Sequence, residues 1–395
     1  MHTEKICYGP KLVALVDRRF AGAATAELMS VLGATRLAKV GTDKAINVYL
    51  VEGCNPDVQA KNRNNLVFVE SLITLETEIA YYGTDYEPII KYISLRASEA
   101  GIGRFNLEVK IFNSHLGETA KSVEVKIGSP LEAAGLPVSM ADPETTFYII
   151  FLAAGRGALV CSGRSADTLK LDMARYYKRT EETPISRATY KLLEAFSYFG
   201  IADGPSGICL DVGAAPGGWS SIMLRNHWKV VAVDNALLDY ESLSSRKVKI
   251  SVLYRESEGE SGIGSACRNG KIEMLSAKNL TMAIGESDLV HIKSNMTAEL
   301  MCLLASAGKF GFLVMDANVE PIETAKILTE LRPLLADNAH VLATLKLPHG
   351  KIGTISKAVS NLSTAYCDIR LKKLPHNRRE ITLCASAALQ CKPAQ

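Results

Sequence analysis

The amino-acid sequence predicts an α/β protein in which a doubly wound, mostly parallel sheet follows a smaller α+β region. From residue 208 onward, short apolar strand patterns alternate with helical patterns, which favours a parallel sheet covered by helices on both faces. Before residue 165 the pattern indicates a β-α-β unit, two further helices, a strand and a hairpin, which is typical of a compact α+β region. The length of 395 residues is enough for two or three domains.

The first 165 residues predict a compact α+β region. Strands are expected at residues 11–16 and 45–51, and the spacing of apolar residues between them predicts a helix that ends at Gly33. Further along, the pattern predicts helices over 88–99 and 116–128, a strand over 105–112, and a hairpin formed by 147–152 and 158–161.

The second half contains the alternating elements of the parallel sheet. Gly218 is expected to open one helix, and residues 323–335 to form another. A stretch rich in glycine and serine at 259–270 indicates a surface insertion, taken as about 250–287. The expected strands are 208–212, 230–233, 289–292, 312–315, 341–345 and 380–385.

The composition is that of an ordinary globular protein. A formal net charge of +3 argues against a tail-driven nucleic-acid binder but leaves room for a local basic groove. The most apolar run, 147–154, is much shorter than the roughly 20 residues of a membrane-spanning helix. The nine cysteines are scattered without the spacing of a metal site. We therefore expect a cytoplasmic protein that binds no metal and no membrane.

The strongest local motif is DVGAAPGGWSS at 211–221, a buried strand followed by a glycine-rich turn and a helix. Glycine lets a ligand approach the backbone, and the helix start offers free N–H groups. Asp234 ends the next strand, 21 residues beyond Gly213, where an acid can bind both hydroxyls of a ribose. This spacing predicts a nucleoside-containing cofactor, either a dinucleotide or S-adenosylmethionine. Pro216 stiffens the loop and disfavours the dinucleotide, and a tight turn without a ligand is the remaining alternative.

The loop resembles that of the FtsJ-like 2′-O-ribose methyltransferases, and four further segments resemble the places where that family carries a Lys-Asp-Lys-Glu tetrad. SRATYKLLEAF at 186–196 would supply Lys191, LVMD would supply Asp316, TLKLP would supply Lys346, and RREITL would supply Glu380. The resemblance implies S-adenosylmethionine as the cofactor. It implies a cofactor site made of Gly213, Ala214, Ala215, Pro216, Gly217, Gly218, Trp219, Asp234, Asn295 and Asp316.

Within this family, the catalytic half resembles the bacterial enzymes that modify a cytidine of 23S ribosomal RNA. That resemblance implies a Rossmann-like methyltransferase domain at 186–395, a linker at 169–185, a THUMP RNA-binding domain at 63–168 and a ferredoxin-like domain at 1–62. Two positions depart from the pattern: Asn295 stands where the relatives have an acid near the adenine, and Ala188 stands where they have a serine.

Basic residues near the expected site are candidates for RNA contacts, because phosphate contacts determine much of the affinity for nucleic acid. Tyr176 and Tyr177 could stack on unpaired bases. Interleaved acids leave open that residues 165–183 are only a solvated linker, and His349 and His376 are expected at the surface or facing RNA. The basic candidates are Arg175, Lys178, Arg179, Arg187, Lys372, Lys373, Arg378 and Arg379.

Taken together, these features predict an S-adenosylmethionine-dependent RNA 2′-O-ribose methyltransferase acting on 23S ribosomal RNA. The alternatives are the same chemistry on transfer RNA and an RNA-binding protein that keeps the fold without turnover. A lysine can act as the base only if burial or a second cation lowers its pKa. Lys346 is expected to be that base or the main group that lowers the pKa of the base, with Lys191 as the second cation. The sequence does not indicate the oligomeric state.

Overall fold

The structure is a computed structural model, and the chain divides into two units, Met1–Leu169 and Lys170–Gln395, which are described separately. Within the described residues, no helix has both the length and the apolar character needed to cross a membrane. The structure describes residues 11–80, 84–112, 116–136, 138–139, 143–152, 157–163, 183–201, 207–244, 248–255, 263, 267, 270–347 and 352–387.

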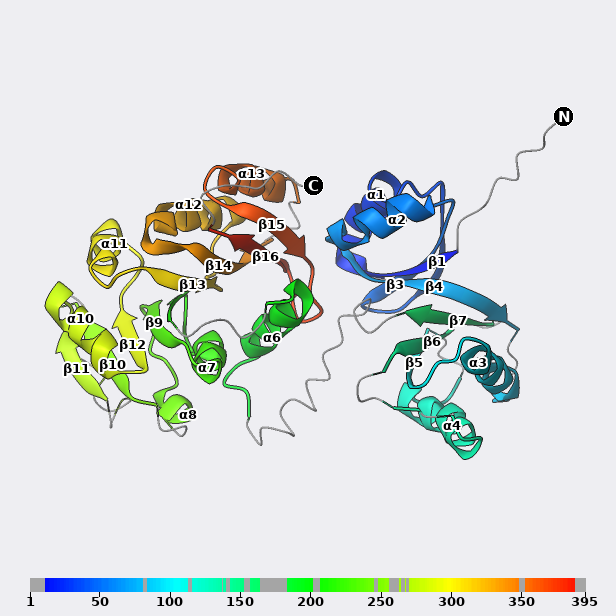
Figure 1. Ribbon diagram of the computed structural model, residues 1–395. Helices are drawn as coiled ribbons and strands as arrows, with labels where there is room; N and C mark the ends of the chain where they lie inside the picture. The colour runs from blue at the N-terminus through cyan, green and yellow to red at the C-terminus, as the bar shows by residue number, and fades with distance from the viewer. Residues whose placement is uncertain are drawn as a thin grey trace. The chain divides into compact units, whose positions relative to one another are not determined.

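The first unit is built on a seven-stranded sheet with the order β2-β3-β1-β4-β7-β6-β5 (Figure 1). All six residues of the internal strand β1 are buried, which fits the apolar run LVALV that precedes its final Asp17. The strands are β1 (Leu12–Asp17), β2 (Arg36–Thr42), β3 (Ile46–Glu52), β4 (Val69–Ile79), β5 (Phe105–Ile111), β6 (Thr145–Phe151) and β7 (Ala158–Gly163). The helices are α1 (Ala21–Ser30), α2 (Pro56–Asn62), α3 (Glu87–Glu99) and α4 (Ala120–Ala133).

Strand β4 joins the two parts of this unit that the sequence assigns to separate domains. It pairs antiparallel with β1 on one side and with β7 on the other. The backbone hydrogen bonds of one sheet therefore run across the predicted boundary at residues 62 and 63. The division into a ferredoxin-like and a THUMP domain stays a prediction, but the two parts share a sheet.

Helix α4 differs from its prediction at both ends. It begins at Ala120, because the side chain of Thr119 accepts a hydrogen bond from the amide of Ser122 and caps it. Gly128, the predicted end, lies inside the helix and is buried. A Cβ there would lie 3.5 Å from Leu107 of β5, so this glycine lets helix and strand pack closely.

The second unit is built on a nine-stranded sheet with the order β11-β10-β12-β9-β8-β13-β14-β16-β15. The ladders from β11 to β14 are parallel, and β16 is antiparallel to both of its neighbours. The strands are β8 (Ile208–Val212), β9 (Lys229–Asp234), β10 (Ile250–Tyr254), β11 (Lys271–Met274), β12 (Leu289–Lys293), β13 (Phe310–Met315), β14 (Leu335–Lys346), β15 (Cys367–Lys372) and β16 (Glu380–Ser386).

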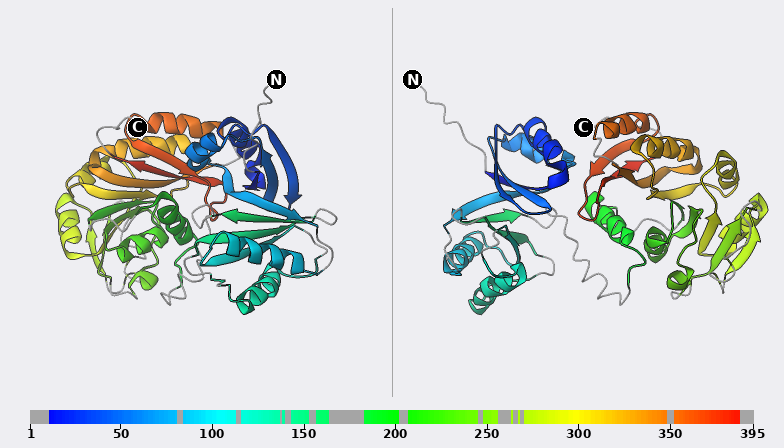
Figure 2. Two further views of the ribbon diagram at one scale, coloured as in Figure 1. Left: turned by 45° about the vertical axis from the view of Figure 1, so that its right-hand side comes forward. Right: turned by 180° about the vertical axis from the view of Figure 1, so that it is seen from behind.

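Helices cover both faces of this sheet. Helices α6 and α7 lie side by side on one face, and α12 and α13 lie together on the other (Figures 1 and 2). The predicted helix at 323–335 begins earlier, at Pro321, and ends at Leu331. The helices are α6 (Ala188–Phe199), α7 (Gly218–Arg225), α8 (Tyr240–Ser244), α10 (Ala277–Glu286), α11 (Ala298–Ala305), α12 (Pro321–Leu331) and α13 (Gly353–Leu362).

The region predicted as an insertion extends the sheet in its described part. Strand β10 pairs in parallel with β12, and β11 pairs in parallel with β10. Most of the glycine-rich stretch itself, 256–262, 264–266 and 268–269, lies outside the described residues. This region thus contributes the edge strand β11, its neighbour β10 and helix α10.

The order of the strands determines where a ligand can bind. From β8 the chain moves outward to β9 on one side, and β13 later pairs with β8 on the other side. In open parallel sheets such a switch point leaves a crevice at the carboxyl ends of the strands. The glycine-rich turn, Asp234 and Asp316 all follow directly on, or end, strands at this edge.

Candidate active site

Strand register brings the four predicted tetrad residues to one place. Lys346 is paired with Glu380 across the antiparallel β14–β16 ladder. Asp316 directly follows Met315, which is paired with Ala343 of β14. Lys191 reaches the same place from helix α6.

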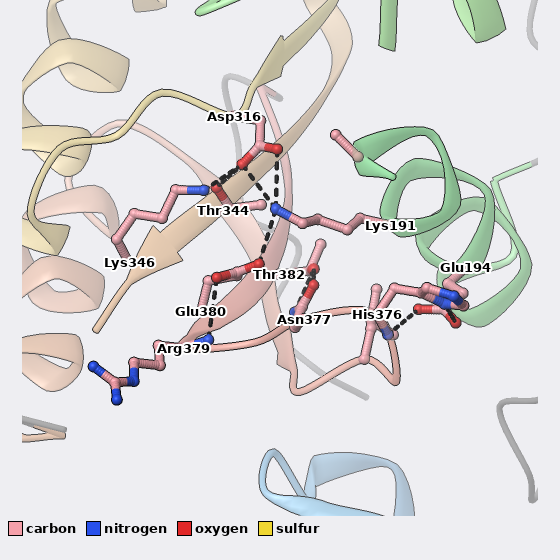
Figure 3. Close-up of polar contacts among 12 residues, drawn as sticks. Lys191, Glu194, Asp316, Thr344, Lys346, His376, Asn377, Arg379, Glu380 and Thr382 are labelled. Carbon is pink, nitrogen blue, oxygen red and sulfur yellow. Dashed lines mark hydrogen bonds and ion pairs between the residues drawn. The ribbon is translucent and has the colours of Figure 1, made fainter. Parts of the chain in front are cut away.

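Two lysines and two carboxylates form an ion cluster in which Lys191 and Glu380 are buried and Asp316 and Lys346 are partly buried (Figure 3). The Nζ atom of Lys191 lies 3.1 Å from Asp316 Oδ2 and 2.8 Å from Glu380 Oε1. Lys346 Nζ lies 2.5 Å from Asp316 Oδ1. The side chain of Lys191 is 7% exposed and that of Lys346 is 17% exposed, so Lys346 is the lysine more open to solvent. The four formal charges of the cluster cancel.

The electrostatics of the cluster hold three of its groups in their charged forms. Burial pushes the pKa of Lys191 down, but the carboxylates of Asp316 and Glu380 outweigh it, and the net pKa is raised. Burial pushes the pKa of Asp316 up, but the charges of Lys346 and Lys191 outweigh it, and the net pKa is lowered. The pKa of Glu380 is lowered as well, because Lys191 again outweighs burial.

The glycine-rich turn packs tightly against the neighbouring strand end. Gly213 has φ +75°, and a Cβ there would lie 2.8 Å from the Cα of Ala317. The carboxylate of Asp234 accepts hydrogen bonds from the amides of Ala215 at 2.9 Å and Ala236 at 2.8 Å. The carboxylate of Asp234 therefore lies against the turn.

Trp219 and Asn295 occupy different places around this turn. The indole nitrogen of Trp219 donates to the carbonyl of Ala188 at 2.7 Å, which ties α7 to α6. Asn295 follows the end of β12, where the amide of the preceding residue, Ser294, donates to the carbonyl of Asp234 at 3.1 Å. Asn295 is thus adjacent in sequence to a residue that contacts Asp234.

Asp211, beneath the turn, is a buried acid that the sequence analysis did not assign to the site. It is 1% exposed, and its Oδ2 accepts a hydrogen bond from Ser220 Oγ at 2.7 Å. Its Oδ1 has no hydrogen-bond partner among the described residues. Burial raises the pKa of Asp211 to about 7, and the charges of Asp316 and Asp234 add to the effect.

The basic residues predicted to contact RNA differ in where the structure places them. Arg175, Lys178, Arg179 and the two neighbouring tyrosines lie outside the described residues, as does His349. Arg187, Arg378 and Arg379 are exposed, and the guanidinium of Arg379 points away from the ion cluster (Figure 3).

The structure corrects the assignment of the two lysines at the end of β15. Lys372 is 5% exposed, with its ammonium 5.2 Å from the centre of the Tyr198 ring. Lys373 is fully buried, and its ammonium donates to the carbonyls of Leu374 at 3.1 Å and Asn377 at 2.6 Å. Both ammonium groups have partners within the fold, so these two side chains are not presented to RNA in this structure.

His376, which was expected at the surface or facing RNA, is partly exposed and also has partners inside the fold. Its Nδ1 lies 2.5 Å from Oε1 of the buried Glu194, and its amide donates to the other oxygen of that carboxylate at 3.0 Å. Its ring stacks on Tyr190, with the ring centres 4.7 Å apart. Glu194 is one helical turn from Lys191 on α6, so this pair fastens the loop before Glu380 to the helix that carries Lys191.

Sequence reasoning missed a further partner of the ion cluster. Thr344 Oγ1 donates to Asp316 Oδ1 at 2.6 Å. The signal was present, because Thr344 and Lys346 are two residues apart on one strand and so share a face. Tyr240 and His291, which lie behind Asp234, were also missed, and no motif in the sequence marks them.

Comparison with known proteins gives the class of the second unit. Residues 184–353 match the FtsJ-like methyltransferase family. A curated relative, the ribosomal RNA large subunit methyltransferase M of Stutzerimonas stutzeri, is 40% identical over 72 residues, covering 16% of this chain and 20% of its own length. The ribosomal RNA large subunit methyltransferase E of Erythrobacter litoralis is 28% identical over 109 residues, covering 28% and 48%. The structure of TrmN from Thermus thermophilus aligns with 96% of this chain and 99% of its own, at 14% identity and a TM-score of 0.34.

The chain therefore contains an FtsJ-like methyltransferase domain at residues 184–353. The segment matched to the first relative spans about a fifth of that relative's length. A domain of this class implies S-adenosylmethionine as the methyl donor.

The residues present fit this cofactor. The tight turn at Gly213 leaves no room for a side chain, the carboxylate of Asp234 lies against the turn, and Asp211 Oδ1 is buried beneath it without a partner among the described residues. A backbone loop with an acid at the end of the next strand suits a nucleoside.

Proposed function

We propose that the second unit transfers a methyl group from S-adenosylmethionine to a ribose 2′-hydroxyl of large-subunit ribosomal RNA. The observation that carries this proposal is the ion cluster of Lys191, Asp316, Lys346 and Glu380 at the carboxyl edge of the sheet. The names of the curated relatives support RNA as the substrate. The 2′-hydroxyl is the part inferred from the chemistry of the cluster.

The cofactor would be held by the turn at 213–218, by Asp234 and by Asn295. When bound, S-adenosylmethionine supplies a methyl group that is already activated, because its sulfonium is a good leaving group. The ribose hydroxyl is the poor partner, since it holds its proton tightly. The task of this chain is to position the hydroxyl and to accept that proton.

The cluster divides this task between its two lysines. Lys191 contacts both carboxylates and has a raised pKa, so it stays an ammonium and contributes a fixed positive charge. Lys346 contacts Asp316 and is the more exposed of the two. We assign to Lys346 the contact with the hydroxyl. It would accept the hydroxyl proton after its own ammonium has given one up.

The carboxylates keep this arrangement in place. Asp316 Oδ1 accepts from both Lys346 and Thr344, which fixes the direction of the Lys346 side chain. Glu380 holds Lys191 and also accepts a hydrogen bond from the amide of Arg379 at 3.2 Å. A positioned acceptor of this kind contributes about 10²–10⁴-fold to the rate of proton transfer.

The test is Lys346→Met, which keeps an unbranched side chain only one atom shorter and removes the amine. Transfer of a labelled methyl group to ribosomal RNA should fall by about 10²–10⁴-fold, while the affinity for S-adenosylmethionine measured by calorimetry should stay the same. Lys326→Met serves as the control, because this lysine is exposed on α12 and should leave both quantities unchanged.

The methylated product identifies both the atom that is modified and the RNA that is the substrate. A 2′-O-methyl group blocks alkaline cleavage of the adjacent phosphodiester bond, so alkaline hydrolysis locates it. A methyl group on a base would overturn the 2′-O assignment. Methylation of transfer RNA but not of ribosomal RNA would overturn the substrate, and near-normal turnover by Lys346→Met would overturn the role of that lysine.

A further inference from the structure

Helix α8 is attached to the glycine-rich turn of the candidate cofactor site. The amide of Asp239, just before the helix, donates to the carbonyl of Pro216 at 2.9 Å. Leu243 is fully buried, and its Cδ1 lies 3.0 Å from where a Cβ on Gly217 would be. The helix therefore packs directly beneath the turn.

A second attachment runs from α8 to Asp234 through two buried side chains. The hydroxyl of Tyr240 lies 2.6 Å from Nδ1 of His291, and Nε2 of His291 lies 3.1 Å from the main-chain carbonyl oxygen of Asp234. A carbonyl oxygen can only accept, so Nε2 carries the ring proton and Nδ1 accepts from the tyrosine. The order of donation is from Tyr240 to His291 and from His291 to Asp234.

This chain of hydrogen bonds holds one end of Asp234 while the turn holds the other. The carbonyl of Asp234 receives His291 Nε2 and the amide of Ser294, both at 3.1 Å. Its carboxylate receives the amides of Ala215 and Ala236. The hydrogen bonds to the carbonyl fix the backbone of Asp234, from which the carboxylate reaches the two amides.

We propose that Tyr240 and His291 are positioning residues that hold the Asp234 carboxylate toward the ribose hydroxyls of S-adenosylmethionine. The inference rests on the proposed function in that Asp234 is taken as the ribose-binding acid. A neutral imidazole suits the task, because it can donate at one nitrogen and accept at the other. Burial lowers the pKa of His291 to about 4, which keeps its ring neutral at pH 7.

The experiment measures the binding of two ligands by calorimetry, without any RNA or turnover. One ligand is S-adenosylhomocysteine, and the other is its analogue in which the ribose lacks both hydroxyls. In His291→Leu the donor to Asp234 is lost, and S-adenosylhomocysteine should bind about tenfold more weakly. The analogue cannot use the Asp234 contact, so its affinity should change less than about twofold.

Two further variants separate positioning from general damage to the fold. His291→Gln places an amide N–H where Nε2 lies and should restore affinity to within about threefold of the natural protein. Tyr240→Phe removes only the hydroxyl and should weaken S-adenosylhomocysteine by about threefold. It also keeps the proposal testable if His291→Leu does not fold.

Tyr366→Phe is the matched control. The hydroxyl of Tyr366 is also buried and also donates to a main-chain carbonyl, that of Leu328 at 2.5 Å, but between elements that do not carry the cofactor residues. Its removal should leave both affinities unchanged.

The outcomes distinguish the inference from the proposed function. Weaker binding of S-adenosylhomocysteine alone supports it. Equal weakening of both ligands, or no weakening in Tyr240→Phe and His291→Leu, would overturn it while leaving the cofactor site intact. A natural protein that binds both ligands equally would show that Asp234 does not bind the ribose, and the assignment of Asp234 would fall together with the inference.

Discussion

Replacing Asp211 by asparagine should change how the stability of the second unit depends on pH. Asp211 is 1% exposed, receives one hydrogen bond from Ser220, and lies near the charges of Asp316 and Asp234. Its carboxylate is therefore costly to ionise in the folded protein, and its pKa is raised to about 7 from an ordinary 3.8. Asparagine has the same shape and does not titrate.

The direction of this pH dependence follows from whether Asp211 loses its proton first in the unfolded or in the folded chain. In the unfolded chain Asp211 ionises near pH 4, whereas in the folded protein it keeps its proton until about pH 7. The stabilisation from the bound proton is complete below pH 4 and is lost as the pH rises to about 7. At about 1.4 kcal/mol per pKa unit, the full loss is about 4 kcal/mol.

The measurable quantity is the difference in unfolding free energy between Asp211→Asn and the natural protein. This difference should shift in favour of the variant by about 2.5 kcal/mol from pH 5 to pH 7 and then level off above pH 8. Urea unfolding followed by tryptophan fluorescence suits the assay, because both tryptophans, Trp219 and Trp228, lie in the second unit.

Asp337→Asn controls for the loss of one carboxylate, since the side chain of Asp337 is 70% exposed. The difference in unfolding free energy between Asp337→Asn and the natural protein should not vary over the same pH range. The reasoning about Asp211 would be refuted if its own difference stayed flat between pH 5 and pH 7, or if it moved in favour of the natural protein.

Three further perturbations have defined outcomes. Gly213→Ala should abolish calorimetric binding of S-adenosylmethionine, because the new Cβ would lie 2.8 Å from backbone of Ala317; binding within threefold of normal would contradict this. Arg378→Ala should lower the slope of log affinity for RNA against log salt by about one, and an unchanged slope would mean that this side chain contacts no phosphate. Glu194→Gln should lower turnover several-fold through looser placement of the loop at His376, with unchanged cofactor affinity; full turnover would make the pair purely structural.

The sequence predicted the parts of the site that follow from local patterns. A strand, a glycine-rich turn and a helix form a recognisable unit, and Gly213 follows β8 while Asp234 ends the neighbouring β9. Thr344 could have been added by the two-residue period of a strand. These features depend on neighbours in the chain, and the chain alone therefore indicates them.

Features that depend on distant partners could not be predicted in this way. Glu194 and His376 are separated by 182 positions, and nothing local marks them as a pair. Lys373 lies in a charged stretch that predicts exposure, yet carbonyl groups of the following loop surround its ammonium. Gly128 resembles a helix end, but close packing against β5 decides its place inside α4.

The four side chains of the ion cluster do not contribute equally to its stability. Asp316 is the common acceptor of Lys191, Lys346 and Thr344, whereas each lysine can be removed and still leave Asp316 with a cationic partner. Removing a carboxylate between two buried ammonium groups leaves like charges facing each other, which is costly. The cluster therefore depends on Asp316 for its stability. A site built in this way keeps its shape before the substrate arrives, because its charges are balanced within the protein.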